Sequence, residues 1–194
     1  MRKRVSERRR EVFFAISDII SSKGLSEVST IEIAKRLGVT QPALYKYFKS
    51  KDDMIIYFLD ELKQYLLNIL KETEKGKTTF EKLKIIYEKH LELIQKTKIL
   101  PRVIFSDEIY IGNDNKRKKL KEVIESYTGG VKRIIEEGIK KGEIKKDVDS
   151  DLIVRFILGS MISSALVWFL NNYNFDLRGE SEKLIKELEK MIKI

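Results

Sequence analysis

The sequence predicts an all-α protein of about nine helices, and three observations support that prediction. Prolines number two and glycines ten in 194 residues, so few positions would interrupt a helix. Apolar residues recur three and four positions apart along most of the chain, as they do on one face of a helix. Alternating runs of β-branched residues, which would indicate strands, are few.

The most informative stretch is residues 29–48, which read STIEIAKRLGVTQPALYKYF. Ser29 and Glu32 have the spacing of a capping box, so a short helix should begin near Thr30. The small side chain of Ala34 would let a second helix approach this one closely. Three apolar residues recur at helical spacing on it: Ile31, Ala34 and Leu37.

A second short helix should follow a tight turn. Gly38 can adopt the left-handed conformation that ends the first helix. Thr40 can cap the second helix, and Pro42 is tolerated in its first turn. Leu44 and Phe48 lie four positions apart and should face the core, which leaves their neighbours free to point outward. Two such helices form a helix-turn-helix, although an ordinary helical hairpin has the same pattern.

Seven further helices complete the prediction. Ser50 and Asp53 repeat the capping-box spacing at the start of a long helix that should reach about Glu74. Gly129 and Gly130 lie inside another helix, where two interior glycines indicate a bend or a close helix contact. One of the expected helices starts at Thr78 and carries apolar positions as far as Ile94, and the others cover 6–23, 50–74, 101–110, 115–141, 149–172 and 181–192.

The positive charge of the chain is concentrated around the helix-turn-helix. Residues 1–51 hold twelve Lys or Arg and five Asp or Glu, a net charge of +7, whereas the full chain carries +9. A basic excess at this place is typical of a surface that binds phosphates of a nucleic acid. Much of it comes from Arg and Lys in the first ten residues, so a solubilising basic end is the alternative.

Residues 152–170 are almost continuously apolar and long enough to span a bilayer. Arg155 and Ser160 interrupt the run, and Glu and Lys crowd both of its flanks. A helix that is apolar all round is more often buried on two sides in a soluble protein, so we expect no membrane association. The charged N-terminus lacks an apolar signal core and the chain has no cysteine, which together favour a cytoplasmic protein.

Residues 24–54, GLSEVSTIEIAKRLGVTQPALYKYFKSKDDM, resemble the DNA-binding unit of the TetR family of bacterial and archaeal transcriptional regulators. The rest of the chain resembles the family in the number and order of its helices. The resemblance implies a helix-turn-helix DNA-binding domain over 1–51 and a helical effector-binding and dimerisation domain over 52–194. It also implies a homodimer that binds double-stranded DNA at a palindromic operator, expected here to be a repressor that a small effector releases.

The resemblance also implies a set of DNA contacts, position by position. Thr30 and Lys51 would reach phosphates, and the helix N-terminus at Lys51 already favours an anion. Gln41 can pair bidentately with adenine, and Ala43 can meet a thymine methyl group. Tyr45 has partial burial against the first helix as an equal alternative. The full set is Thr30, Thr40, Gln41, Pro42, Ala43, Tyr45, Lys46, Tyr47 and Lys51.

The C-terminal domain offers candidates for an effector site and for a dimer interface. Aromatic and polar side chains of the middle helices would line an apolar cavity for a lipid-like or aromatic effector, with plain core or surface positions as the alternative. In the family the last two helices usually form the dimer interface, which would explain the apolar run. The effector candidates are Tyr65, Tyr87, His90, Phe105, Tyr127 and Trp168. The interface candidates are Phe156, Ser160, Trp168, Phe169, Leu184, Leu188 and Met191.

Other classes of function find little support. The sequence has no Gly-rich phosphate loop and no plausible catalytic triad, so we expect no enzyme. His90 is the only histidine, and without cysteines or a carboxylate cluster it offers too few ligands, so we expect neither a metal nor a cofactor. The remaining alternatives are an architectural DNA-binding protein without sequence preference and a constitutive repressor with a filled core.

Overall fold

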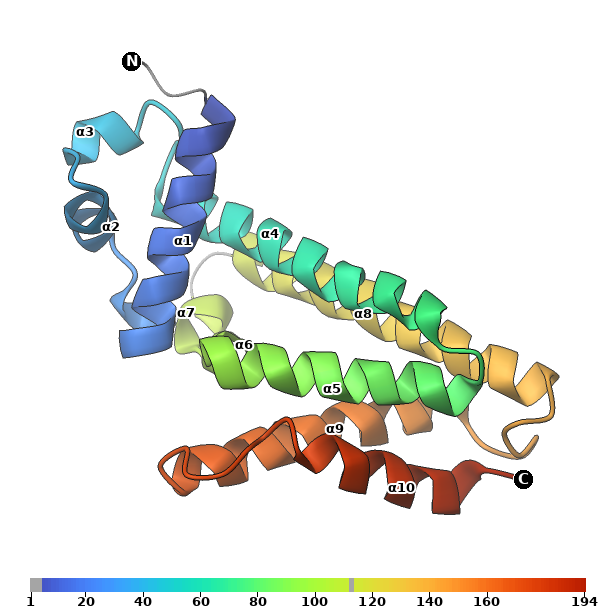
Figure 1. Ribbon diagram of the computed structural model, residues 1–194. Coiled ribbons are helices and arrows are strands. Elements are labelled where there is room, and N and C mark those ends of the chain that lie inside the picture. The colour runs from blue at the N-terminus through green and yellow to red at the C-terminus, as the bar shows by residue number, and fades with distance from the viewer. Residues whose placement is uncertain (1–4, 112–113) are drawn as a thin grey trace. The chain divides into compact units, whose positions relative to one another are not determined.

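The structure is a computed structural model that describes residues 5–111 and 114–194 (Figure 1). Arg2, Lys3 and Arg4 of the basic N-terminus lie outside the described residues. The described residues form helices and no strand, which confirms the all-α prediction. The α-helices are α1 Val5–Lys23, α2 Thr30–Leu37, α3 Gln41–Leu44, α4 Lys51–Glu72, α5 Thr79–Thr97, α6 Ile99–Ile104, α7 Asp107–Tyr110, α8 Asp114–Lys140, α9 Ser150–Leu170 and α10 Glu180–Ile192. Two 3₁₀ helices, η1 Leu25–Glu27 and η2 Thr73–Lys75, follow α1 and α4.

The expected single helix over residues 101–110 is wrong, because two short helices, α6 and α7, occupy this region. Ser106 separates them: its hydroxyl accepts a hydrogen bond from the backbone N–H of Glu108 at 3.3 Å and so caps α7. A serine competes well for such an N-cap position, and it ends one helix by starting the next.

The chain packs into two compact units. We call residues 1–63 and 97–123 the head unit, and residues 64–96 and 124–194 the body unit. Helices α4 and α8 each contribute their first part to the head unit and their second part to the body unit.

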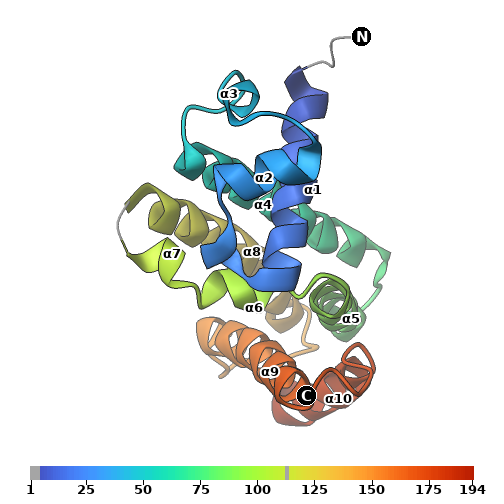
Figure 2. The same ribbon diagram turned by 90° about the vertical axis from the view of Figure 1, so that its left-hand side faces the viewer.

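In the head unit, α1 buries one apolar face as expected. Phe13 stacks on Phe58 of α4 with ring centroids 5.5 Å apart. Arg102 of α6 donates a hydrogen bond from Nη1 to the carbonyl of Ile20, at 2.9 Å, near the end of α1. Figure 2 shows α2 against α1, with α3 beside them. The buried residues of α1 include Val12, Phe13, Ile16, Ile19 and Ile20.

The apolar residues that recur at helical spacing on α2 do not all face inward. Ile31 is 67% exposed, whereas Ile33 is fully buried together with Ala34. On a helix of eight residues, apolar positions at 31, 33 and 34 fit two inner faces, and the contact with α1 selects the one through Ile33.

In the body unit, α5 lies among the second parts of α4 and α8 and the helices α9 and α10 (Figure 1). A Cβ atom on Gly130 of α8 would collide with the side chain of Leu70 of α4. The close helix contact expected at the two glycines is therefore present, and Gly130 is the residue that permits it.

Candidate nucleic-acid interface and ligand-binding region

The helix-turn-helix is built by caps and by one left-handed residue. The hydroxyl of Ser29 accepts a hydrogen bond from the backbone N–H of Glu32 at 3.1 Å, so the predicted cap is confirmed. Gly38 ends α2 with φ 62°, a conformation that costs glycine little. Thr40 takes the N-cap position of α3, but its side chain makes no capping hydrogen bond, which leaves the hydroxyl available.

The α3 region presents polar and aromatic side chains outward. The helix itself ends at Leu44, earlier than expected, and residues 45–47 continue as turns. Leu44 and Phe48 are buried as predicted, while Tyr45 is 50% exposed. Of the other DNA-contact candidates, Thr40, Pro42 and Lys46 are exposed, and Thr30, Gln41, Ala43, Tyr47 and Lys51 are partly exposed.

Two arginines of α1 adjoin this region, a contact that their positive charge in the sequence does not predict. The guanidinium of Arg9 lies 4.9 Å from the ring centre of Phe48 and 4.6 Å from that of Tyr57 in α4. Such cation–π contacts help to hold the end of the helix-turn-helix against α1 and α4. Arg8 lines a hollow of about 200 Å³ together with Ala43, Lys46 and Tyr47, among others. More than thirty positions separate Arg8 from α3, so sequence spacing gave no signal for this contact.

Lys51 is engaged in an ion-pair cluster at the start of α4. Its Nζ lies 3.2 Å from Oε2 of Glu108 in α7. The other carboxylate oxygen, Oε1, accepts a hydrogen bond from Nζ of Lys116 in α8 at 2.6 Å. Lys116 also pairs with Asp52 at 3.1 Å. We call Lys51, Asp52, Glu108 and Lys116 the α4 cluster.

Burial and charge act against each other in the α4 cluster. Only 6% of the Lys116 side chain is exposed. Burial disfavours the ionised form of Glu108, but hydrogen bonds from Lys116 and Lys51 outweigh it and hold the pKa of this carboxyl below its ordinary value. The resemblance assigned Lys51 to the DNA backbone, and the structure shows that this lysine already has a carboxylate partner.

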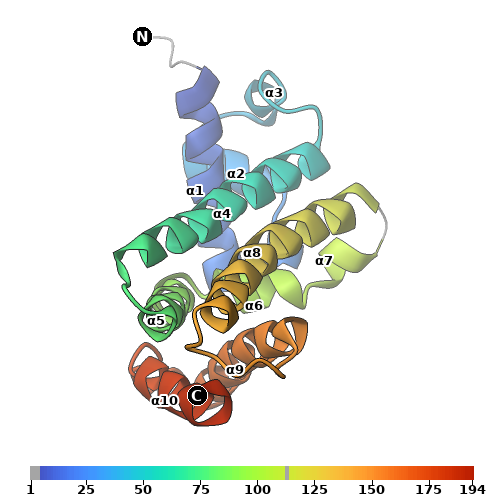
Figure 3. The same ribbon diagram turned by 90° about the vertical axis from the view of Figure 1, so that its right-hand side faces the viewer.

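Further ion pairs join the first part of α4 to that of α8, which run side by side in Figure 3. Lys119 pairs with Asp60 at 2.9 Å and with Glu122 at 2.8 Å. Lys63 pairs with Glu122 at 2.6 Å. Hydrogen bonds from Lys119 and Lys63 lower the pKa of Glu122 to about 2.

The buried polar side chains of the body unit form neutral pairs. Nδ1 of His90 in α5 lies 3.2 Å from the hydroxyl of Tyr127 in α8, and the two rings stack at 5.5 Å. Burial lowers the pKa of His90 to about 4 and raises the pKa of Tyr127, so both are uncharged at neutral pH. One turn earlier on α5, the hydroxyl of Tyr87 lies 3.1 Å from that of Ser160 in α9.

The effector candidates therefore separate into groups. Tyr87, His90 and Tyr127 are buried in the body unit. Trp168 is also buried there, but its Nε1 donates to the carbonyl of Phe175 at 2.9 Å, near the end of α9. Tyr65 is exposed and lines a surface hollow of about 350 Å³ with residues of α4 and α5. Phe105 is 68% exposed in the head unit, because it ends α6 at the break between the two short helices, so it is not a core residue.

The interface candidates also divide. Phe156 is 56% exposed, and together with other exposed apolar side chains it forms an outer face of α9. Met191 is exposed, whereas Ser160, Phe169 and Leu184 are partly exposed. Trp168 and Leu188 are covered by their own chain, because they lie on the inner faces of α9 and α10, and they retain little surface for a partner. The exposed apolar residues of α9 are Leu152, Phe156, Leu166, Val167 and Leu170.

Helix α9 also meets the length and hydropathy of a membrane span, with a mean hydropathy of 1.9 over its most apolar window. Core helices of soluble proteins meet the same criteria, so this single helix is weak evidence for a membrane.

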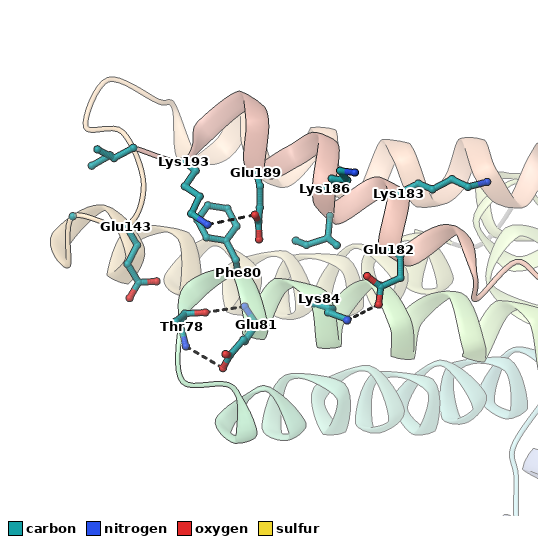
Figure 4. Close-up of a pocket in the computed structure, with 13 residues that line it drawn as sticks. Thr78, Phe80, Glu81, Lys84, Glu143, Glu182, Lys183, Lys186, Glu189 and Lys193 are labelled. Carbon is teal, nitrogen blue, oxygen red and sulfur yellow. Dashed lines mark hydrogen bonds and ion pairs between the residues drawn. The ribbon is translucent and has the colours of Figure 1, made fainter.

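An open groove of about 890 Å³ lies between the start of α5 and α10 (Figure 4). Lys84 pairs with Glu182 across it, and Nζ of Lys193 lies 5.3 Å from the ring centre of Phe80. Four glutamates and four lysines line the groove, so it has no net charge that would select an ion. None of the effector candidates lines this groove.

Over residues 5–111 and 114–194, no group of three or more His, Cys, Asp or Glu is placed to hold a metal ion.

Two protein families match the chain. The family described as "Bacterial regulatory proteins, tetR family" matches residues 15–58, which include the helix-turn-helix. The family described as "YsiA-like protein, C-terminal region" matches residues 58–190, which is more than half of the chain.

Individual relatives match over most of their length. The "Fatty acid metabolism regulator protein" of Bacillus subtilis (strain 168) is 27% identical, over 92% of either chain. The "Nucleoid occlusion factor SlmA" of Vibrio atlanticus (strain LGP32) is 26% identical, over 83% of either chain. Among solved structures, FadR from Bacillus subtilis in complex with stearoyl-CoA has a TM-score of 0.81 and 27% identity, covering 92% of this chain and 96% of that one. FadR from Bacillus halodurans has a TM-score of 0.83 at 23% identity, covering 97% and 96%, and it shows the shared fold.

Proposed function

Since the chain belongs to the TetR family of transcriptional regulators, we propose that it is a repressor that binds a palindromic operator as a homodimer and is released by a long-chain acyl effector. It is a DNA-binding, ligand-responsive transcriptional regulator, in a family of regulators rather than enzymes. The finer parts of the proposal are the repressor role, the operator symmetry, the dimer and the effector class. We also propose a DNA-binding domain over residues 1–51, a regulatory domain over 52–194, and action in the cytoplasm, where the DNA lies.

The observation that carries the DNA-binding proposal is the outward set on α3 and its turn. Exposed hydroxyl, aromatic and ammonium groups follow the Gly38 turn, and the buried Leu44 and Phe48 hold the opposite side. A helix presented in this way can enter the major groove and read base edges, while basic side chains around it contact phosphates.

Selection of bound sequences from random duplex DNA, followed by footprinting, tests this proposal. We expect two inverted half-sites whose centres lie about 34–36 Å apart or a multiple of that distance, because a two-fold dimer presents two recognition helices. Recovery of unrelated or asymmetric sequences would contradict it. That outcome would favour architectural binding without sequence preference instead.

Two substitutions separate base reading from phosphate contact. Gln41→Ala should lose roughly 1–3 kcal/mol of discrimination at one base position. Lys51→Ala should weaken binding to all sequences about equally and lower the salt slope by about one. If both variants change base preference in the same way, the proposed division of roles is wrong.

The dimer proposal is supported by the outer face of α9. Phe156, Leu166 and Leu170 are exposed on one helix, and a face of this kind is typical of a protein–protein contact. Met191 and the partly exposed Leu184 of α10 extend the apolar surface to the neighbouring helix.

A matched pair of substitutions tests the interface. Phe156→Glu would place an unpaired charge in a desolvated contact and should turn the dimer into a monomer that binds the operator poorly. Phe105→Glu is the control, because it makes the same change at a similarly exposed phenylalanine in the head unit. Sedimentation at equal concentrations measures the result, and a Phe156→Glu protein that stays dimeric would place the interface elsewhere.

The acyl effector is supported by two lines of reasoning. A relative that is 27% identical over nearly the whole chain was solved with stearoyl-CoA. In this chain, the neutral pairs His90–Tyr127 and Tyr87–Ser160 give the apolar core of the body unit a few polar groups, the usual composition of a site for such a ligand. We propose that Tyr87, His90 and Tyr127 face the effector.

Thermal unfolding with stearoyl-CoA, and with free CoA as the control, tests the effector class. A ligand at a hundred times its dissociation constant should stabilise the protein by about 2.7 kcal/mol, and the same ligand should weaken operator binding. Equal effects of the two compounds would exclude recognition of the acyl chain. Stabilisation without any change in operator affinity would contradict the proposed coupling between effector binding and DNA release.

A further inference from the structure

We propose that Glu108 competes with operator DNA for Lys51, so that this carboxylate sets how tightly the protein holds DNA of any sequence. The inference rests on the proposed contact between Lys51 and a DNA phosphate. It adds a residue of α7, outside the helix-turn-helix, to those that determine DNA affinity.

The geometry of Glu108 suits a competitor. One carboxylate oxygen, Oε2, lies 3.2 Å from the ammonium of Lys51, and the other, Oε1, is held by Lys116. Lys116 is nearly buried and is itself fixed by Asp52, so Glu108 is anchored through Oε1, the oxygen that does not pair with Lys51. A carboxylate anchored in this way holds its other oxygen, Oε2, at a constant position.

Lys51 is the exchangeable partner in the α4 cluster. Its side chain is the most exposed of the four, so an outside anion can reach it, whereas Lys116 is shielded. A phosphate carries the same charge as a carboxylate and can accept the same hydrogen bonds. When Lys51 turns to a phosphate, Glu108 keeps the ammonium of Lys116 and is not left without a partner.

The two states therefore differ by one partly exposed ion pair, between Lys51 and Glu108. Pairs of this kind contribute little, so we expect removal of the competitor to tighten DNA binding about two- to fivefold for each bound copy. The gain should appear on operator and unrelated DNA alike, because a phosphate contact carries no sequence information.

The test is a double-mutant cycle on Lys51 and Glu108, with affinity measured on the selected operator and on a scrambled duplex over a range of salt concentrations. Glu108→Gln should tighten binding to both duplexes and steepen the salt dependence. In the Lys51→Ala background the same substitution should leave affinity unchanged. An equal gain with and without Lys51 would overturn the proposal, since it would mean that Glu108 merely repels DNA.

Asp52→Asn is the charge-matched control. It removes one carboxylate charge from the same cluster, at the residue that pairs with Lys116, and it leaves the ion pair between Lys51 and Glu108 in place. Any gain in affinity from it should be the same with and without Lys51. If Glu108→Gln fails to fold in thermal unfolding, Glu108→Asp shortens the side chain by one methylene, and a Lys51-dependent gain should still appear. Its absence would equally overturn the proposal.

The arms of this experiment keep the two proposals distinguishable. Failure to select any operator contradicts the proposed function, while the competition is still measurable on the scrambled duplex. If Lys51→Ala alone changes neither affinity nor salt slope, Lys51 does not contact phosphate and the competition falls with it. If Lys51→Ala weakens binding but Glu108→Gln has no effect, the phosphate contact stands and the competition alone is wrong.

Discussion

The two units of the molecule hold their inward-facing polar groups in opposite ways. The α4 cluster of the head unit consists of two carboxylates and two ammonium groups, and its members other than Lys116 remain in contact with solvent. The body unit buries His90 with Tyr127 and pairs the buried Tyr87 with the partly exposed Ser160, all without charge. The head unit is thus built to exchange one charged partner for another, and the body unit to keep charge out of a site proposed for an acyl chain.

The largest expected effect is a difference in salt dependence between the two units. Phosphate contacts release counterions, so operator affinity should fall on the order of 10³-fold between about 50 and about 200 mM salt. The stabilisation that stearoyl-CoA gives beyond that of free CoA should change far less, because burial of an acyl chain does not depend on ion pairs. Titrations with operator DNA and with stearoyl-CoA over the same series of salt concentrations measure this. Equal losses of affinity for the two ligands would contradict the expected difference.

Removal of the buried ammonium should break the α4 cluster. Lys116→Met keeps most of the side-chain stem but leaves Glu108 and Asp52 without their shared partner. We expect the free energy of unfolding to fall by about 2–3 kcal/mol, less than for a fully buried pair because both carboxylates reach solvent. Lys118→Met is the control on the same helix, because Lys118 is exposed. Equal destabilisation of the two variants in urea would show that the cluster contributes nothing.

Acid should destabilise the body unit through His90. Its pKa is about 4 in the folded protein and near 6.5 when unfolded, so only the unfolded chain takes up a proton between these values. Stability from this residue is complete above pH 6.5 and is lost as the pH falls toward 4, by about 2 kcal/mol from pH 7 to pH 5. His90→Gln should remove that part of the pH dependence, measured by urea unfolding at both pH values. Parallel curves for the two proteins would mean that His90 is protonated in the folded state.

The smallest effect concerns the second neutral pair. Tyr87→Phe removes the hydroxyl that meets Ser160, and the serine keeps its hydrogen bond to the carbonyl of Ile157 at 2.8 Å. We therefore expect a loss of about 1 kcal/mol in unfolding free energy and no change in operator affinity without effector. Tyr127→Phe should cost more, since it leaves Nδ1 of the buried His90 without that partner. The reverse order in thermal unfolding would contradict this account of the two pairs.

Local signals predicted much of the fold. The cap at Ser29, the left-handed Gly38 and the cap at Ser50 each act within four residues, so the sequence contains the whole interaction. Prediction succeeded less well where a contact with a helix distant in sequence decides which side chains are buried. Ile33 rather than Ile31 faces inward because α1 lies on that side of α2.

The candidate site shows the same limit. DNA-contact roles for the α3 residues could be predicted by position, because the motif is continuous in sequence, and these roles stay predictions. The pairing of Lys51 with Glu108 could not be predicted, because Glu108 lies 57 positions later in the chain. It also belongs to a four-residue helix, α7, which the sequence pattern predicted as part of one longer helix. The sequence also did not predict the contact between His90 and Tyr127, although both residues were expected near the effector.

The contact of Leu70 with Gly130 limits how the second part of α4 can travel along α8. Leu70 occupies a notch that only a residue without a side chain leaves open, and the bulky Tyr127 and Ile134 stand one turn away on either side. Sliding α4 along its axis would drive Leu70 out of the notch and against one of them. A tilt of α4 about Leu70 disturbs this contact least. Within the body unit, the second part of α4 can therefore rotate about the contact more easily than it can slide along α8.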